Sequence, residues 1–249
     1  MSKKTTSWMT WMSLALIAAS AVTYFIHFLI FRDAHHIFLY LIGDIAFLFI
    51  NVLMVTLVIE RLLSQREKNV LMKKLNMVIG TFYSEVALEL MNRFRGFVSN
   101  APDLCGRLEI RPAWSKKDFQ KAAEAARGFA YKIQIDKAAL IDLQAFLGQK
   151  RTFLLQLLEN PNLLEHERFT DLLWAVFHLA EELAFRGDKI DRLPAADYEH
   201  LGQDLKRAYS QIASEWVAYT QHLKESYPFL FSLAARINPF SPNPTAIIS

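Results

Sequence analysis

Cysteine and glycine are scarce in this sequence. A single cysteine, Cys105, stands among 249 residues. One thiol excludes an internal disulfide and a zinc cluster built from cysteines, and it fits a reducing compartment. The eight glycines leave few tight functional turns. A glycine-rich phosphate loop, a dinucleotide fingerprint, HExxH and G-x-S-x-G are all absent. We therefore expect a protein that is not an enzyme and that binds no cofactor.

A concentration of positive charge is also missing. The net charge is only +3, with 28 Lys and Arg residues balanced by 25 Asp and Glu residues. Beyond the first quarter of the chain the two signs are interspersed, so there is no dense basic surface of the kind that binds phosphate backbones. Nucleic acid is not an expected partner.

Two long apolar runs dominate the N-terminal quarter, at about 7–31 and 37–63. Each exceeds the roughly 20 apolar residues that a helix needs to cross a bilayer. The first run could instead belong to a signal peptide, because Lys3 and Lys4 precede it and the small residues of 18–21 resemble a cleavage site. The run continues without a break to Phe31, which is too long for such a peptide, so we favour two transmembrane helices.

The short connection 32–36 makes these two spans a hairpin, and the lipid bilayer is its expected partner. The balance of positive charge then sets the orientation, because cytoplasmic flanks are enriched in Lys and Arg. We expect both termini in the cytoplasm and an integral membrane protein, with the bacterial inner membrane as its location. Only Arg32 lies at the turn, whereas the open end carries Lys3, Lys4, Arg61, Arg66, Lys68, Lys73 and Lys74.

Polar residues recur inside the spans and suggest a polar seam. Asp44 and Asn51 lie seven residues apart, hence near one helix face, and an antiparallel hairpin places His27 level with Asp44 and Ser20 level with Asn51. The favoured interpretation is hydrogen bonding that docks the two helices. Asp44 and Asn51 of several copies could instead form a ring that favours cations. A proton relay between His27 and Asp44 is the third interpretation.

The sequence predicts an all-α protein in four parts. They are a transmembrane hairpin (1–64), a helical stem (65–98), a cytoplasmic helical bundle (99–240) and a loose tail (241–249). Apolar residues of the stem recur every three or four positions, which predicts one helix from the membrane to about Arg95. Gly80 is its expected hinge, through which motion of the span could reach the bundle.

Turn and cap residues divide the bundle into helices. Two prolines and a glycine predict a loop at 99–113. Ser115 and Asp118 have the spacing of a capping box. Asn160–Pro161 marks a stop, and the apolar segment after Pro228 is expected to pack on the bundle. Further helices are predicted from Asp136, over 163–186, and from Pro194 to Ser226.

The candidate metal ligands are His178, Glu182 and His200. His178 and Glu182 lie four residues apart on one predicted helix, and the next carries Asp197, His200 and Asp204. Carboxylate-bridged bundles use a Glu-x-x-His on each of two helices, with further Glu residues. Here Asp replaces Glu and partners are missing. A solvated polar face is therefore the favoured interpretation, and no metal is predicted.

Two stretches, IGDIAFLFINVLMVTLVIERLL and HLKESYPFLFSLAARINPF, resemble segments of uncharacterised bacterial two-span inner-membrane proteins. The resemblance implies no activity and transfers no site. We expect a membrane-anchored interaction or sensory protein that self-associates and presents its bundle to a cytoplasmic protein partner. The alternatives are an oligomeric cation channel lined by Asp44 and Asn51, and a membrane-disrupting effector.

Overall fold

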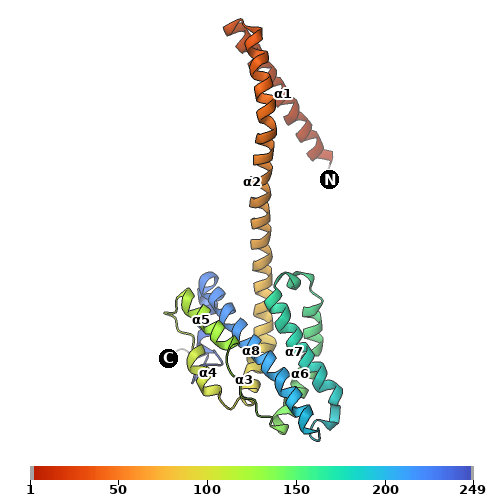
Figure 1. Ribbon diagram of the computed structural model, residues 1–249, viewed down its shortest axis with the longest axis vertical. Helices are drawn as coiled ribbons and strands as arrows, with labels where there is room; N and C mark the ends of the chain where they lie inside the picture. The colour runs from red at the N-terminus through yellow and green to blue at the C-terminus, as the bar shows by residue number, and fades with distance from the viewer. Residues whose placement is uncertain (1–2, 248–249) are drawn as a thin grey trace. The chain divides into compact units, whose positions relative to one another are not determined.

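The protein is all-helical. A computed structural model describes the backbone of residues 3–247, with side chains except at 3–10, 34, 36, 69, 73, 164 and 165. The chain divides into two compact units, Met1–Lys68 and Asn69–Ser249. Its helices (Figure 1) are α1 (Lys3–Phe31), α2 (Ala34–Phe82), a π-helix (Tyr83–Ala87), α3 (Leu88–Arg95), α4 (Ala101–Leu108), α5 (Lys116–Arg127), α6 (Lys137–Leu158), a 3₁₀ turn (Pro161–Glu165), α7 (Glu167–Arg186), a second 3₁₀ turn (Gly187–Lys189), α8 (Ala195–Ser226) and α9 (Pro228–Arg236).

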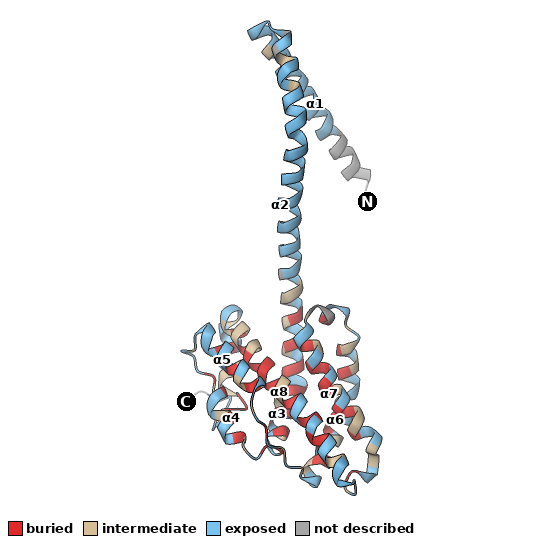
Figure 2. Ribbon diagram, in the orientation of Figure 1, coloured by how far each residue is buried: buried red, intermediate tan, exposed pale blue. Residues whose placement is uncertain are grey.

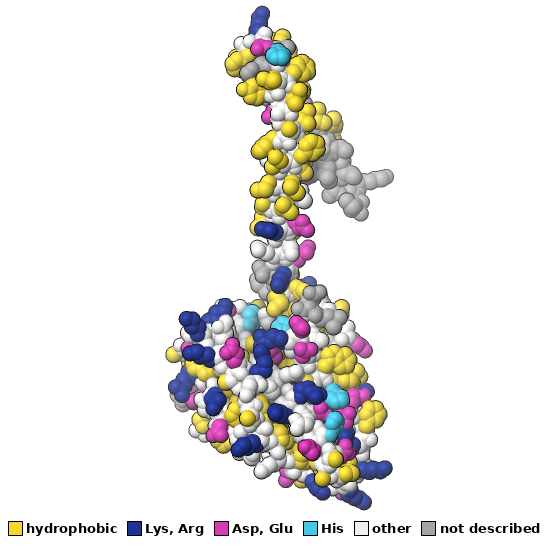
Figure 3. Space-filling model, in the orientation of Figure 1, with side chains coloured by type: hydrophobic (Ala, Val, Ile, Leu, Met, Phe, Trp, Pro, Cys, Tyr) yellow, Lys and Arg dark blue, Asp and Glu magenta, His cyan; other side chains and the backbone are white. Residues whose placement is uncertain are grey.

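The first unit consists of α1 and the N-terminal part of α2. The backbone turns at Arg32, whose φ of 50° is left-handed and whose amide donates to the carbonyl of Phe28 at 2.9 Å. Among the described residues of 11–31 and 37–63, no side chain is buried (Figure 2). Hydrophobic side chains cover this part of α2 (Figure 3). By length and composition alone, two helices of the described chain could cross a membrane.

The predicted helix up to about Arg95 does end at Arg95, but it changes type on the way. Tyr83–Ala87 forms a π-helix between α2 and α3. A π-helical turn is wider than an α-turn, so it rotates the residues that follow relative to those that precede it. Tyr83, Val86 and Ala87 are buried within it. The apolar spacing gave no sign of this change.

Helix α8 lies at the centre of the second unit and contacts α3, α5, α7 and α9 (Figure 1). Aromatic side chains pack between α8, α7 and the end of α2. The ring centroid of Tyr83 lies 5.1 Å from that of Trp216 and 5.2 Å from that of Tyr219. The ring centroids of Phe82 and Phe169 lie 5.3 Å apart. The buried Tyr83 hydroxyl donates to the carbonyl of Ile212 at 3.2 Å, which leaves no unsatisfied polar group at that ring.

The helix caps confirm the predicted starts of two helices and show that a third helix starts later than predicted. Asp118 accepts from the amide of Ser115 at 2.8 Å, and the predicted capping box is present. Asp136 accepts from the amide of Ala139, and α6 begins there as expected. The helix predicted from residue 163 begins only at Glu167, because a 3₁₀ turn precedes it and His166 Nδ1 accepts from a backbone amide as the cap.

The loop predicted at 99–113 contains the helix α4. Pro102 lies in its first turn, where a missing amide hydrogen costs nothing, and Leu104 and Leu108 are buried. The segment around Ile133 runs beside this region and forms an isolated bridge with Val98. Pro102 therefore lies at the start of a helix and does not interrupt one.

The C-terminal helix α9 packs on the second unit, as predicted, through Phe231 and Ala234. Beyond it, the buried Asn238 accepts from Trp216 Nε1 at 2.9 Å and donates to the carbonyl of Leu108 at 2.8 Å. The expected tail, 241–249, is mostly exposed over its described part, and residues 248–249 lie outside that part.

Candidate metal centre

Helices α7 and α8 form a hairpin that brings together four ionisable side chains. The second 3₁₀ turn, which opens with Gly187 at φ 51°, reverses the chain between them. His178 and Glu182 lie four residues apart on α7, and His200 and Asp204 lie four residues apart on α8. Because i and i+4 share a helix face, each helix presents one imidazole and one carboxylate to the other. Histidines beside acidic side chains are visible on this unit in Figure 3.

The imidazoles and carboxylates alternate around a small space. His178 Nε2 lies 3.5 Å from Asp204 Oδ2 and 3.8 Å from Glu182 Oε1. His200 Nε2 lies 3.3 Å from Asp204 Oδ2 and 3.6 Å from Glu182 Oε2. One ligand atom each from His178, Glu182 and His200 lie within 4.8 Å of one another. These distances are too long for good hydrogen bonds but short enough for His178, Glu182 and His200 to share one small cation, with Asp204 Oδ2 beside the two imidazoles.

Two arginines hold the carboxylates from the outside. Arg186 donates to Glu182 and makes a two-point contact with Asp197, at 2.6 and 3.2 Å. Arg207 donates to Asp204 Oδ1 at 3.0 Å. Bidentate arginine–carboxylate contacts fix geometry as well as charge. Arg207 leaves Oδ2 of Asp204 near both histidines, and Arg186 leaves Oε1 of Glu182 near His178.

Burial and charge differ across the cluster. Asp204 is only 2% exposed, whereas the side chains of His178 and His200 are 44% and 52% exposed. The hydrogen bond from Arg186 is the main cause that lowers the pKa of Glu182, and it likewise lowers the pKa of Asp197. Both carboxylates therefore remain ionised at neutral pH, and the histidines face stable negative charge.

This donor set has two chemical uses. Neutral imidazoles offer lone pairs, which together with carboxylates bind a divalent transition metal ion. Protonated imidazoles would instead form ion pairs with the same carboxylates. In both cases the cluster connects α7 to α8.

The three metal candidates named from the sequence do converge. The favoured interpretation was a solvated polar face, and both imidazoles are indeed half-exposed, but the side chains also face one another. The spacing of residues along each helix predicted that His178 pairs with Glu182 and that His200 lies near Asp204. The roles of Arg186 and Arg207 were not foreseen, because they depend on how the two helices pack.

The polar residues of the first unit are spread along α1 and α2. Ser20, Asp44 and Asn51 are exposed, and His27 is half-buried with its ring centroid 4.7 Å from that of Phe31. The pairing of His27 with Asp44 stays a prediction, as does the seam.

Gly80 lies in α2 against α8. A Cβ at Gly80 would stand 2.6 Å from the hydroxyl oxygen of Tyr219. This close approach gives the glycine a packing role, and its role as a hinge remains a prediction.

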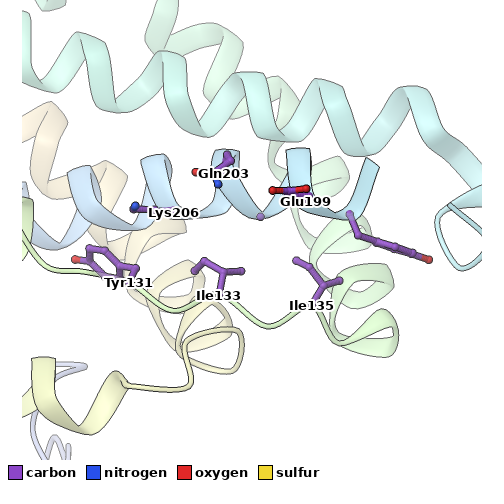
Figure 4. A pocket seen from close by; sticks show the side chains of 8 residues that line it. Tyr131, Ile133, Ile135, Glu199, Gln203 and Lys206 are labelled. Carbon is purple, nitrogen blue, oxygen red and sulfur yellow. The ribbon is translucent and has the colours of Figure 1, made fainter. Parts of the chain in front are cut away.

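A groove of about 370 Å³ lies between α8 and the extended segment around Ile133 (Figure 4). Tyr131 and Ile135 line one side, and Glu199 and Lys206 line the α8 side. Its surface is of mixed polarity. The sequence allows a short strand at 131–135 but shows no partner for it, so it did not predict that this segment lies beside α8.

Three arginines surround a second cavity of about 350 Å³, which also lies along α8. Arg168 contacts the buried Glu215 at 2.6 Å, and Arg127 contacts the same carboxylate at 3.6 Å. Arg207, the third, is the partner of Asp204. Two of these three guanidinium groups thus share one carboxylate, and the third is paired with Asp204.

The fold defines a class of all-helical proteins with an apolar two-helix N-terminal unit and a helical C-terminal domain. Residues 3–63 match the N-terminal helical domain of the uncharacterized protein MJ1433, and residues 71–236 match its C-terminal helical domain. The chain belongs to this MJ1433 family. The uncharacterized protein MJ1433 of Methanocaldococcus jannaschii is 42% identical over 229 residues, which cover 92% of this chain and 91% of that protein.

No solved structure matches the chain. The expectation of an uncharacterised family without a named activity is confirmed. The relative comes from an archaeon, whereas the resemblance noted from the sequence was to bacterial proteins.

Proposed function

We propose that this protein is a membrane-anchored helical protein whose α1–α2 hairpin spans the bilayer and whose domain from residue 69 onward serves interaction or sensing at the membrane surface. The observation that carries the proposal is the exposure of the apolar side chains of 11–31 and 37–63. Helices this apolar are buried when they form the core of a soluble protein. Burial in lipid accounts for their exposure here.

The distribution of positive charge supports an orientation with both termini in the cytoplasm. Arg61, Arg66, Lys68 and Lys74 follow the second span, and Arg32 stands at the turn. Cytoplasmic flanks are richer in Lys and Arg than the opposite side. The domain then lies in the cytoplasm, where its single thiol, Cys105, stays reduced.

Self-association is part of this proposal. Asp44 and Asn51 are exposed in the single chain, and a carboxylate in lipid costs about 2.5–3.5 kcal/mol on insertion scales. Contact with a second copy would remove both groups from lipid. The domain of each copy is then available to a cytoplasmic protein partner.

Thiol labelling of intact cells tests the anchor and its orientation. In a Cys105→Ala background, His35→Cys and Gln156→Cys each place one thiol at an exposed position. A membrane-impermeant maleimide should label His35→Cys in intact cells, and Gln156→Cys only after lysis. The full-length protein should also stay in the membrane pellet after alkaline extraction. Recovery in the soluble fraction, or a mature N-terminus beyond residue 21, would overturn the proposal.

An oligomeric cation channel is the second candidate, and the exposure of Asp44 and Asn51 on the single chain favours it. Copies arranged around an axis could direct these side chains into a shared pore, where a carboxylate ring selects cations. Purified protein in liposomes should then conduct cations, and Asp44→Asn should strongly reduce the current.

Asp33→Asn, which removes the same charge at the turn, is the matched control and should conduct normally. Absence of current at every potential removes the channel candidate. Unselective release of an encapsulated dye would point to the membrane-disrupting effector.

A further inference from the structure

We propose that His178, Glu182, His200 and Asp204 form a binding site for one divalent transition metal ion of the Zn²⁺ type, which fastens α7 to α8. This site goes beyond membrane anchoring and does not depend on it. Three features support the site: the spacing of the donors, the burial of Asp204 and the arginines around them.

Four spacings between imidazole nitrogens and carboxylate oxygens lie near the edge length of a tetrahedral site. Zinc–nitrogen and zinc–oxygen bonds near 2.0–2.1 Å put neighbouring ligands of a tetrahedron about 3.4 Å apart. The four imidazole–carboxylate distances are 3.3, 3.5, 3.6 and 3.8 Å. His178 faces Oε1 of Glu182 and His200 faces Oε2, so an ion that takes both imidazoles and one oxygen of Glu182 requires that carboxylate to turn.

Asp204 Oδ2 is an independent indication of a bound cation. Among the described residues this atom is buried without a hydrogen-bond partner, and Nε2 of His178 and of His200 lie 3.5 and 3.3 Å from it. An unsatisfied buried polar group costs about 1–3 kcal/mol, and more when it is charged. A metal ion between the carboxylate and the imidazoles removes that cost.

The arginines supply the outer support that metal ligands need. Arg207 fixes Asp204 through Oδ1, and Arg186 fixes Glu182 while being held itself by Asp197. Such partners orient ligands, and their loss typically weakens metal binding 10–100-fold. The carboxylates are thus preorganised before an ion arrives.

The chemistry of the donors selects the class of ion. Two imidazole nitrogens suit zinc, cobalt and related transition ions, whereas calcium and magnesium prefer oxygen ligands alone. Two protons compete for the site, because protonated His178 and His200 carry the same total charge as one divalent ion. Binding is therefore measured at a fixed pH of 7.5.

The test uses the full chain in detergent, without a histidine tag and stripped of metal with a chelator. Zn²⁺ is titrated in competition with a chromogenic chelator, and Co²⁺ is followed by its visible absorption. We expect one ion per chain and the intense absorption of tetrahedral Co²⁺, which Zn²⁺ abolishes. Zn²⁺ at 100 times Kd should raise the Tm of the domain by roughly 5–10 °C.

The variants His178→Gln and His200→Gln should each weaken Zn²⁺ binding at least tenfold, since even loss of an outer partner has that effect. Arg207→Gln, which removes no ligand, should weaken binding about 10–100-fold. Glu181→Gln is the matched control, because Glu181 neighbours Glu182 but pairs with Arg151 on α6. His222→Gln controls for the number of histidines. Both should bind as the unaltered protein does.

Two results would overturn the site. The first is the absence of stoichiometric Zn²⁺ binding and of tetrahedral Co²⁺ absorption in the full chain, which would assign the cluster to ion pairing alone. The second is unchanged affinity in the His178→Gln/His200→Gln double variant. The substitutions at His178 and His200 alter half-exposed side chains. Circular dichroism is used to check that each variant is folded before its titration.

Discussion

The hydroxyl oxygen of Tyr219 on α8 lies 2.6 Å from the position that a Cβ on Gly80 of α2 would occupy. The glycine thus permits a close approach of the Tyr219 ring, which stacks on Tyr83 with centroids 5.2 Å apart. Since that stacking limits how far the ring can withdraw, the space at residue 80 and the hydroxyl at residue 219 depend on each other.

Gly80→Ala should therefore have opposite effects in two backgrounds. In the unaltered chain the new methyl group overpacks against Tyr219, at a typical cost of about 1–3 kcal/mol that exceeds the gain of about 1 kcal/mol in helix propensity. In the Tyr219→Phe background the nearest ring carbon lies at 3.5 Å, and the propensity gain should dominate. Urea unfolding of the unaltered protein, the two single variants and the double variant measures the free energy of unfolding of each.

These four proteins form a double-mutant cycle. A coupling energy near zero between the two substitutions would show that Tyr219 does not restrict the space at residue 80. The hinge hypothesis would then be the stronger explanation of the glycine, because loss of flexibility affects both backgrounds equally.

Asn238→Ala should destabilise the second unit by about 2–4 kcal/mol. The substitution leaves Trp216 Nε1 and the carbonyl of Leu108 without their shared partner, and Asn238 is fully buried. Tryptophan fluorescence during urea unfolding provides the measurement. Asn100→Ala is the control, because Asn100 bridges the backbone at Ala130 and Lys132 at an exposed site where water can replace it. Equal losses in the two variants would contradict the prediction.

His222 should make the second unit sensitive to acid. Burial lowers its pKa below the usual 6.5, against a smaller opposite effect of Glu225. The unfolded chain therefore binds a proton at higher pH than the folded chain, so this stabilising contribution is present above about pH 6.5 and is lost as the pH falls through the lowered pKa. His222→Gln should flatten the fall in unfolding free energy between about pH 7 and pH 5. An unchanged slope would refute this assignment.

Cys105 should react slowly with thiol reagents. Burial is the main cause that raises its pKa above the ordinary 9.0, although Arg95 opposes the shift. Less thiolate is present at pH 8, and the rate should still be rising above pH 9. The folded chain holds this proton more tightly than the unfolded chain, so stability falls as pH rises beyond the ordinary value.

Labelling rates from pH 7 to 10 test the thiol prediction. The comparison protein is Gln156→Cys in the Cys105→Ala background, which offers an exposed thiol. Equal rates for the two proteins would show that Cys105 is not protected.

Helix boundaries were predictable where side chains mark them directly. Asp136 and the Ser115–Asp118 pair have the residue types that accept backbone amides, and both helices begin there. His166 also caps a helix, but histidine is not a preferred cap, so the start of α7 was placed too early. The π-helix at Tyr83–Ala87 has no sequence signature, because tertiary packing of its buried side chains selects it over an α-turn.

The candidate metal centre was half-visible in the sequence. Helical spacing paired His178 with Glu182 and placed His200 and Asp204 together on the next helix. The distance between the two pairs depends on the packing of α7 against α8, which spacing along one helix cannot supply. The same limit hid Arg207, whose guanidinium matters through Asp204.

Gly187 has nothing within 4 Å of where a Cβ would be, so an alanine there would meet no obstacle, yet its φ of 51° is one that side-chain-bearing residues seldom adopt. The penalty for replacing it is thus torsional rather than steric. A larger residue would push the backbone toward another reversal, and α8 would leave the hairpin at a different angle. A connector that touches neither imidazole therefore contributes, through one dihedral and together with the packing of α7 on α8, to the alignment of both.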